Sequence, residues 1–267
     1  MERLTYRYLS RDSKTSKATL ERKFKVYLST PPIFQIRRRD CAHLIIDGTY
    51  FRNNLCLVLY QDNDIKYTQL YRFSNGEHFK EIKEDLEKLK VLGVHIESIT
   101  CDGKRSTLKA IKKVYPEIII QRCLVHVYRM VHIWLKEKPK TIAALELKQI
   151  INLLSMVNTH NDRIAFIADF NKWYEKHHTF INEKATNDLT SSWWYKHKNL
   201  RRSAIVIRKA IPNLFHFLDN HAIPKSTNAL ESFFGHLKDS LSIHRGLSHA
   251  NRKSFIKWYL HFKNQSR

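Results

Sequence analysis

The sequence contains no run of 18 or more apolar residues, so it predicts no transmembrane helix. Its first residues, MERLTYRYLS, lack the apolar core of a secretory signal peptide. The four cysteines form no Cys-x-x-Cys pair, and without a secretory context a disulfide framework is not expected. These absences predict a reducing, intracellular compartment and no membrane role. In a bacterium that compartment is the cytoplasm, with association to the nucleoid.

Acidic residues are also scarce: 25 Asp and Glu stand against 47 Lys and Arg, which gives a formal net charge of +22. A charge of this size indicates the kind of partner rather than the fold. DNA is the predicted partner, because each Lys or Arg placed near a phosphate releases counterions. The alternative is a solvated, Lys-rich surface. The 267 residues, 43% of them hydrophobic, suffice for one sizeable core or for one domain with a small appendage.

Residues 1–30 predict a separate helical segment. Two short helical patterns flank a polar break, and Ser16 is placed to cap the second helix. A basic second helix after a short turn is typical of a helix-turn-helix that binds DNA, although any small helical hairpin would give the same pattern. Pro31 and Pro32 end this segment, and residues 31–42 are predicted to be a basic linker. The linker carries three candidate DNA-phosphate contacts, Arg37, Arg38 and Arg39.

From residue 43 the pattern changes to strands that alternate with helices. Strands are expected at 43–51, 55–60, 65–73, 94–100 and 117–121, with a helix after the third strand and another after the fourth. This order allows the fourth strand to lie beside the first and parallel to it. Asp47, in the first strand, and Asp102, directly after the fourth, would then be neighbours in space.

Both aspartates precede a glycine, and Asp-Gly is also a strong signal for a hairpin turn. The strand pattern continues past Asp47, however, and a helical pattern follows Asp102, which could instead cap that helix. A carboxylate inside a buried strand is costly unless a charged group meets it. Together, the two aspartates of a very basic protein favour a site where two Mg²⁺ ions clamp a phosphodiester.

A third carboxylate is expected from Glu231, in a helical block from about 227 to 264. Leu230, Phe233 and the apolar residues that follow at helical spacing form a stripe, and Glu231 lies at its edge. The helix can therefore direct Glu231 along the sheet towards the two aspartates. Asn228 and Glu231 also have the spacing of a helix capping box, which is the alternative interpretation.

Four motifs, IDGTYF, CDG, QRCLVH and TNALES, occur in this order. They resemble the catalytic core of Mutator-type DDE transposases, including their bacterial insertion-sequence relatives, over about 43–245. The resemblance implies an α/β, ribonuclease H-like catalytic domain at 43–267, with a mixed sheet and a helical insertion at about 127–225. It also implies that Asp47, Asp102 and Glu231 form the metal-binding catalytic triad, with Mg²⁺, or alternatively Mn²⁺, as cofactor.

The function that this resemblance implies is DNA transposition: cutting and joining the ends of a mobile element by hydrolysis and strand transfer. A homodimer is expected, because two ends must be joined. Two alternatives remain: a transposase-derived DNA-binding protein without catalysis, and a ribonuclease H-like nuclease that cuts but never joins. Family members usually carry more sequence ahead of the core than the roughly 40 residues here, often a fuller DNA-binding region.

Cys123 and His126 share a helix face at a spacing of three residues. A structural zinc ion would need two further ligands, and no second pair has a suitable spacing. The pair is either a buried cysteine with a hydrogen-bonded histidine or part of the site, because the resemblance places it beside the catalytic centre. We therefore count His126 as a candidate catalytic residue that hydrogen-bonds near the scissile phosphate or an aspartate.

The segment SSWWYKHKNLRR at 191–202 combines aromatic and basic residues. Aromatic faces can stack on unpaired bases while cations follow the backbone; in the resembled family an aromatic residue of the insertion can hold a flipped base. The alternative is a core tryptophan pair beside a solvated basic face. The candidate DNA contacts here are Trp193, Trp194, Lys196, Lys198, Arg201 and Arg202. Elsewhere they are Lys104, Arg105, Lys238 and Arg245, with His244 beside the last.

Overall fold

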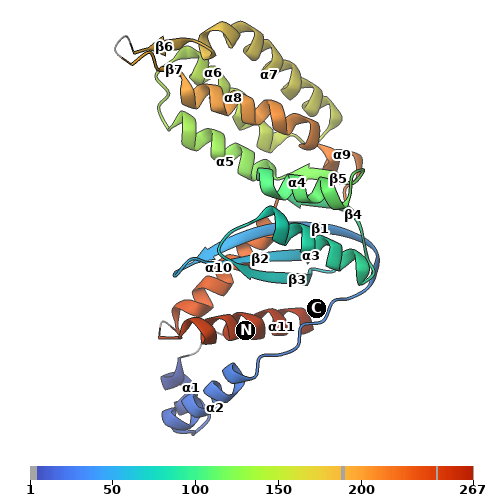
Figure 1. The fold of residues 1–267 in the computed structure, drawn as a ribbon, viewed down its shortest axis with the longest axis vertical. Coiled ribbons are helices and arrows are strands. Elements are labelled where there is room, and N and C mark those ends of the chain that lie inside the picture. The colour runs from blue at the N-terminus through green and yellow to red at the C-terminus, as the bar shows by residue number, and fades with distance from the viewer. Residues whose placement is uncertain (1–4, 188–189, 245, 267) are drawn as a thin grey trace. The chain divides into compact units, whose positions relative to one another are not determined.

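The computed structural model describes residues 5–187, 190–244 and 246–266 (Figure 1). The chain has a mixed α/β fold and divides into two compact units. The sheet unit comprises residues 1–97, 105–117 and 228–267, and the helical unit comprises residues 98–104 and 118–227. Each unit is described by itself.

A mixed five-stranded sheet has the strand order β3-β2-β1-β4-β5. Its strands are β1 (Arg39–Phe51), β2 (Leu55–Asp62), β3 (Tyr67–Ser74), β4 (Val94–Cys101) and β5 (Ile119–Arg122). The first three form an antiparallel meander, in which Asp47 lies opposite Leu59, and β4 and β5 run parallel. The five strands that the sequence predicted are all present. The assignment to the ribonuclease H-like class stays a prediction.

The first strand begins at Arg39, four residues earlier than predicted, and so takes in the end of the expected linker. The physical reason is a backbone hydrogen bond of 3.0 Å from the Arg39 N–H to the Gly93 carbonyl, just before β4. Further along both strands, Cys41 and His43 lie beside Glu97. Residue numbers therefore increase in the same direction along both strands, from Arg39 and Gly93 to His43 and Glu97. β1 and β4 thus run parallel in the sheet unit, as the sequence analysis predicted.

Helices cover both faces of the sheet: α3 (Phe79–Val91) and α4 (Arg105–Val114) on one, α10 (Asn228–Ser242) and α11 (His249–Gln265) on the other (Figure 1). Alternation along the strands decides which residues meet which layer. Ile45 and Leu57 join the buried core beneath α10 and α11. On the opposite face, Arg72 of β3 pairs with Asp85 of α3 at 2.7 Å.

The N-terminal helices are α1 (Tyr6–Asp12) and α2 (Lys17–Ser29). The Ser16 side chain accepts the Thr19 N–H, and α2 ends just before the two prolines, so the predicted hairpin and its cap are confirmed. On its other side α2 packs against α11, where the Trp258 Nε1 donates to the Tyr27 carbonyl at 2.7 Å. A DNA-binding helix-turn-helix role for this segment stays a prediction.

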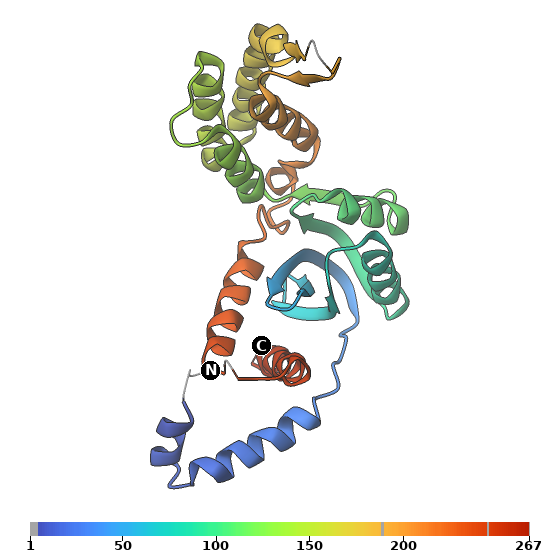
Figure 2. The same cartoon turned by 60° about the vertical axis from the view of Figure 1, so that its left-hand side comes forward.

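The helical unit is a bundle of α5 (Leu124–Leu135), α6 (Ile142–Leu153), α7 (His160–Ile181) and α8 (Lys198–Ala210), seen at the top of Figure 2. Phe166, Phe170 and Trp173 of α7 are almost fully buried in its core. Short helical turns follow α6 and α8: η1 (Leu154–Met156), η2 (Ile211–Asn213) and α9 (His216–Asp219).

The predicted helical insertion contains one element that the sequence analysis missed. Between α7 and α8 the chain forms an antiparallel hairpin of β6 (Lys184–Thr186) and β7 (Trp193–Tyr195). Trp193 and Tyr195 suit a strand, because aromatic residues have a high β-propensity. Their rings pack edge to face, with the centroids 5.3 Å apart. Within the described residues, no helix is both long and apolar enough to cross a membrane.

Candidate active site

Asp47 lies in the middle of β1 and is only 7% exposed. Its Oδ1 accepts the N–H of Gly48 at 2.8 Å. Because side chains alternate along a strand, Asp47 faces the same side as Ile45 and Phe51, which pack in the core beneath α10 and α11. The strand therefore directs this carboxylate towards the helical layer that carries Glu231.

Glu231 lies in the first turn of α10, between the buried residues Leu230 and Phe233, and its Oε1 atom is buried. Two turns further along α10, the Lys238 Nζ lies 5.8 Å from the ring centroid of Phe51 at the end of β1. These packing contacts place Glu231 on the same side of the sheet as Asp47.

The capping-box interpretation of Glu231 stays open. It requires Asn228 to be the N-cap, and α10 begins at Asn228 itself, one residue from that arrangement. Thr227, the residue before α10, is fully buried. Its backbone N–H donates to the Cys123 Sγ, and its hydroxyl lies 3.3 Å from the Nδ1 of His126 in α5. Tertiary contacts therefore fix the start of this helix.

Glu77 is a carboxylate that packs on Gly48, the residue after Asp47 on β1, and the sequence analysis missed it. A Cβ added to Gly48 would collide with the carboxyl group of Glu77. Glycine at position 48 therefore makes room for this side chain, which would have to move if a Cβ were present. Glu77 lies in the loop before α3, where no periodicity distinguishes it from other surface acids, so the sequence held no signal for it.

Asp102 follows β4 and belongs to the helical unit. Its Oδ1 accepts the backbone N–H of Lys104 at 2.9 Å, and its Oδ2 lies 3.4 Å from the Lys104 Nζ. The local turn before α4 is thus closed by the aspartate, which is the cap-like role considered from the sequence. The side chain remains 14% exposed, so the turn orients the carboxylate without sealing it from solvent.

Arg122, at the end of β5, supports this turn and was also missed. It is 7% exposed, and it donates from Nη2 to the Asp102 carbonyl at 3.2 Å. Its guanidinium packs so closely on Gly103 that a Cβ there would collide with it. Gly103 also has φ +82, a conformation that other residues rarely adopt. The glycine of the CDG motif is therefore required twice over.

Cys123 and Thr227, both buried, form a cluster with the partly buried His126 in the helical unit. Cys123 caps α5, and its Sγ accepts from the Thr227 N–H at 3.3 Å and from the Thr227 Oγ1 at 3.6 Å. The same hydroxyl lies 3.3 Å from the His126 Nδ1. The predicted hydrogen bond from His126 to a phosphate or an aspartate stays a prediction. In the structure the partner of the His126 Nδ1 is the Thr227 hydroxyl.

This cluster changes the acidity of its thiol. Burial opposes the Cys123 thiolate, but the hydrogen bond from His126 and backbone N–H groups outweigh it, so the pKa of Cys123 is lowered. Cys101, at the end of β4, shows the opposite: burial and the neighbouring Asp102 charge raise its pKa to about 12. The pKa values of the two cysteines therefore shift in opposite directions: His126 and backbone N–H groups outweigh burial at Cys123, whereas burial and the Asp102 charge outweigh the backbone hydrogen bond from Gly103 at Cys101.

The predicted basic contacts near β1 have internal partners. The Arg37 guanidinium lies 4.1 Å from the ring centroid of Tyr67, and Arg38 packs against Gly93. Arg39 pairs with the fully buried Asp62 at 2.8 Å, so its charge neutralises a buried carboxylate. Arg105, the first residue of α4, is exposed.

A basic cleft of about 380 Å³ lies where β1 and α10 end. It is lined by Phe51, Arg52, Lys238, Leu241, Ser242, His244 and Arg252. Burial lowers the pKa of His244, so the positive charge at neutral pH comes from the lysine and the two arginines. Both arginines were missed, because neither lies in a basic run. The predicted contact Arg245 lies outside the described residues.

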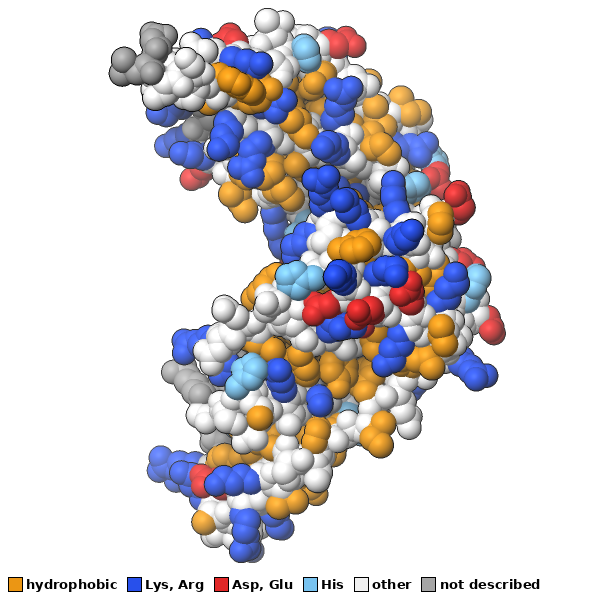
Figure 3. Space-filling view, in the orientation of Figure 1, with side chains coloured by type: hydrophobic (Ala, Val, Ile, Leu, Met, Phe, Trp, Pro, Cys, Tyr) orange, Lys and Arg blue, Asp and Glu red, His pale blue; other side chains and the backbone are white. Residues whose placement is uncertain are grey.

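The hairpin of the helical unit exposes its tryptophans. Trp193 is 54% and Trp194 50% exposed, which rules out the core-pair interpretation. The Lys184 Nζ lies 4.3 Å from the ring centroid of Trp193, and the Arg201 guanidinium lies 3.9 Å from that of Tyr195. On the face drawn in Figure 3, basic side chains are spread over the bundle with few acidic ones among them.

The remaining predicted contacts of this segment differ in their surroundings. Lys198 is exposed, and the Lys196 Nζ lies 3.6 Å from Glu183 in a pair open to solvent. The Arg202 guanidinium lies 4.5 Å from the ring centroid of Trp134. Such exposed contacts are worth little to stability, so these cations can exchange them for phosphate at small cost.

Residues 71–191 match the family model of the Mutator family of transposases. This segment is similar to the transposase domain of that family. The resemblance inferred from the four motifs is thereby confirmed, and it supports a transposase role and implies DNA binding. The matched segment contains Asp102, Arg122, Cys123 and His126, while Asp47 and Glu231 lie outside it. No curated protein matches the chain significantly.

Proposed function

We propose that this transposase cuts DNA at the ends of a mobile element and joins the ends to target DNA, with Asp47, Asp102 and Glu231 as its metal-binding triad. The observation that carries the proposal is the match to Mutator-family transposases, joined to a buried carboxylate in the central strand of the sheet. An acid is tolerated at such a position when a positive charge meets it.

The donor set suits Mg²⁺ or Mn²⁺, because all three groups are carboxylates and these ions prefer hard oxygen ligands. The bound ions would activate the attacking oxygen and stabilise charge on the phosphodiester. The chain's own residues prepare the ligands. Gly48 and Lys104 donate backbone N–H groups that orient Asp47 and Asp102, and Arg122 braces the turn that holds Asp102.

Two surfaces support the DNA-binding part of the proposal. The cleft lined by Lys238, Arg52 and Arg252 presents cations beside the end of the Asp47 strand, as binding of a phosphate backbone requires. The hairpin presents Trp193 and Trp194 beside Lys184, a combination that suits stacking on an unpaired base.

The catalytic proposal is tested by Asp47→Asn in a strand-transfer assay, with DNA that carries the sequences flanking the reading frame. The variant should lose Mg²⁺-dependent transfer by about three orders of magnitude or more, since it removes a metal ligand. DNA binding, measured by fluorescence anisotropy, should be unchanged. Asp40→Asn, an exposed position on the same strand, is the matched control. Transfer at the native rate by Asp47→Asn would remove Asp47 from the site.

The products of the same assay separate the alternatives. Joined products indicate a transposase, cut but unjoined products indicate a nuclease, and binding without either indicates a silent DNA-binding protein. Light scattering of the DNA complex tests the homodimer that joining two ends requires.

The role of the hairpin is tested by Trp193→Ala. Loss of one stacked base should weaken binding to element-end DNA with an unpaired terminal base by about 1–3 kcal/mol. Ile164→Ala removes another exposed apolar side chain of the helical unit and should leave the affinity unchanged. Equal affinities of the two variants would contradict stacking at this position.

A further inference from the structure

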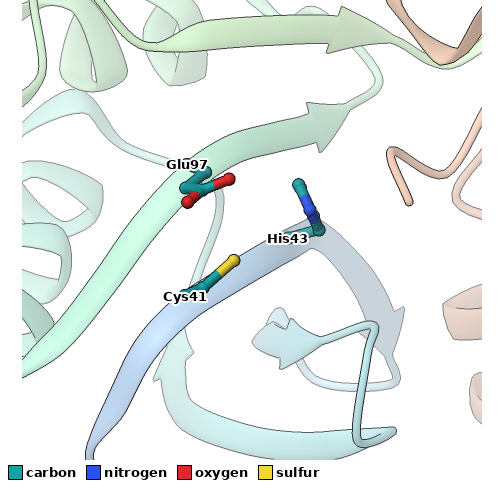
Figure 4. Close-up of side chains that lie close together, drawn as sticks. All are labelled: Cys41, His43 and Glu97. Atoms are coloured by element: carbon teal, nitrogen blue, oxygen red, sulfur yellow. The ribbon is translucent and has the colours of Figure 1, made fainter. Parts of the chain in front are cut away.

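Cys41, His43 and Glu97 form a compact group in the sheet unit, away from the residues assigned above (Figure 4). The thiol, one imidazole nitrogen and one carboxylate oxygen all lie within 4.8 Å of one another. Among the described residues, this is the one group of three such side chains close enough to hold a metal ion together.

The strands create this group. Cys41 and His43 are two residues apart on β1, so they project from the same face. Glu97 projects from β4, the parallel neighbour of β1, and Figure 4 shows the three side chains turned towards a common point. The backbone of β1 is held here by two hydrogen bonds: the His43 N–H donates to Asp64 at 3.2 Å, and the His43 carbonyl accepts from Asn63 at 2.9 Å.

We propose that Cys41, His43 and Glu97 bind a zinc ion that links β1 to β4. One thiolate, one imidazole and one carboxylate are ligand types that Zn²⁺ combines in proteins. At zinc–ligand distances of about 2.0–2.3 Å, tetrahedral ligands stand roughly 3.3–3.8 Å apart, so small side-chain rotations complete the site. Three protein ligands leave the fourth position for water.

The surroundings permit a cation. Arg39 is the positive group close to Cys41, and it is neutralised by Asp62 at 2.8 Å and by Asp64 at 3.8 Å. His43 is 4% exposed, Cys41 is half-buried, and Glu97 is exposed. The buried His43 therefore fixes the position of the ion, and the exposed Glu97 lies on the side from which the ion can enter.

Zinc binding must displace a proton from Cys41. Burial and a hydrogen bond to Glu97 raise the pKa of this thiol, so the metal-free group is protonated at neutral pH. Affinity should therefore fall as the pH is lowered, because protons compete with the ion for the sulfur.

The zinc site is distinct from the catalytic proposal. His43 precedes Asp47 by four residues on the same strand, which is about 13 Å. Its ligands also differ in kind: thiolate and imidazole select zinc, whereas carboxylates accept magnesium. Failure of one site therefore does not predict failure of the other.

The test titrates the purified full chain with Co²⁺, a spectroscopic substitute for zinc, and then displaces it with Zn²⁺. We expect one Co²⁺ per chain with a thiolate-to-metal charge-transfer band, displaced by Zn²⁺ and unaffected by excess Mg²⁺. Cys41→Ser should abolish the band, and Glu97→Gln should weaken Zn²⁺ binding at least tenfold. Zinc should also raise the Tm of the native chain but not that of Cys41→Ser.

His95→Gln is the matched control, because His95 is an exposed ligand-type residue two positions before Glu97 on β4. It should leave the band and the affinity unchanged. Glu97→Gln alters an exposed side chain and is expected to fold, as circular dichroism can verify. Absence of a thiolate band in the native chain, or equal Zn²⁺ affinity of Glu97→Gln and His95→Gln, would overturn the proposal.

Discussion

Gly103 shows how one residue can be required for reasons that its neighbours in sequence do not reveal. Its positive φ disfavours any side chain, and the buried Arg122 guanidinium occupies the place where a Cβ would lie. Gly48 has the second constraint only, since it lies in extended backbone against Glu77. The two Asp-Gly pairs of this chain therefore have glycine for different structural reasons: backbone conformation and space at Gly103, and space alone at Gly48.

Gly103→Ala should lower the free energy of unfolding by about 1–3 kcal/mol, because both backbone strain and a collision with Arg122 result. Gly235→Ala is the control: this glycine lies in α10 with open space around the added carbon. It should stabilise the chain by about 0.5–1 kcal/mol. Urea unfolding of both variants checks the prediction, and equal stabilities would contradict it.

The lowered pKa of Cys123 yields a prediction on protonation. Burial alone would raise this pKa, and the hydrogen bond from His126 is the leading effect that reverses it. In His126→Ala the balance should reverse, so that the thiolate forms only at higher pH than in the native chain. The far-ultraviolet absorbance of the thiolate, taken as the difference from Cys123→Ser, follows this titration.

Cys41 and Cys101 interfere little with this titration, because the pKa values of both are raised. Ala144→Gly, in the neighbouring helix α6, removes a methyl group without touching the cluster and controls for general loosening. An unchanged Cys123 titration in His126→Ala would show that the imidazole does not stabilise the thiolate.

The packing of α3 on the sheet depends on an ion pair rather than on apolar contacts alone. Arg72 of β3 donates from Nε and Nη2 to the two carboxylate oxygens of Asp85 at 2.7 Å each. The Asp85 side chain is 5% exposed, so it needs this partner, and hydrogen bonding to Asp85 raises the pKa of Arg72. The pair fixes the helix against the edge strand.

Asp85→Ala should cost about 2 kcal/mol of unfolding free energy, since it removes the two-oxygen partner of a partly buried guanidinium and leaves it only the exposed Glu84, 3.1 Å away. Glu87→Ala is the control on the same helix, because the Lys83–Glu87 pair of 3.0 Å is largely exposed. That substitution should change stability by less than about 0.5 kcal/mol. Chemical denaturation of both variants decides, and a similar loss in each would refute a specific role for Asp85.

The net charge of +22 belongs to the molecule as a whole, and its consequence is a steep dependence of DNA binding on salt. If the chain contacts at least six phosphates, its affinity for duplex DNA should fall by about 10³ between 50 and 200 mM salt. Fluorescence anisotropy at several NaCl concentrations measures the slope. Arg52→Ala, in the basic cleft, should make this slope shallower by the amount expected for about one phosphate contact. Lys66→Ala, in the turn that follows β2, should leave the slope unchanged.

Much of the fold could be predicted because period and order are local properties. The apolar run around Asp47 and the helical spacing after Asp102 predicted strands and helices, and their order predicted the parallel pairing. The hairpin was missed, because the three residues of β7 are too few to show a period. Its tryptophans were undecided between core and surface, since composition cannot tell which side of a strand is covered.

The sequence by itself determined the charge, the order of the motifs and the position of a carboxylate inside a buried strand, because each depends only on residue type and spacing. The tertiary structure decided the contacts of those residues. Thr227 reaches the Cys123 sulfur across 104 residues of chain, and Glu97 meets Cys41 only because β4 lies beside β1. Such contacts follow from packing between distant segments, which no local pattern encodes.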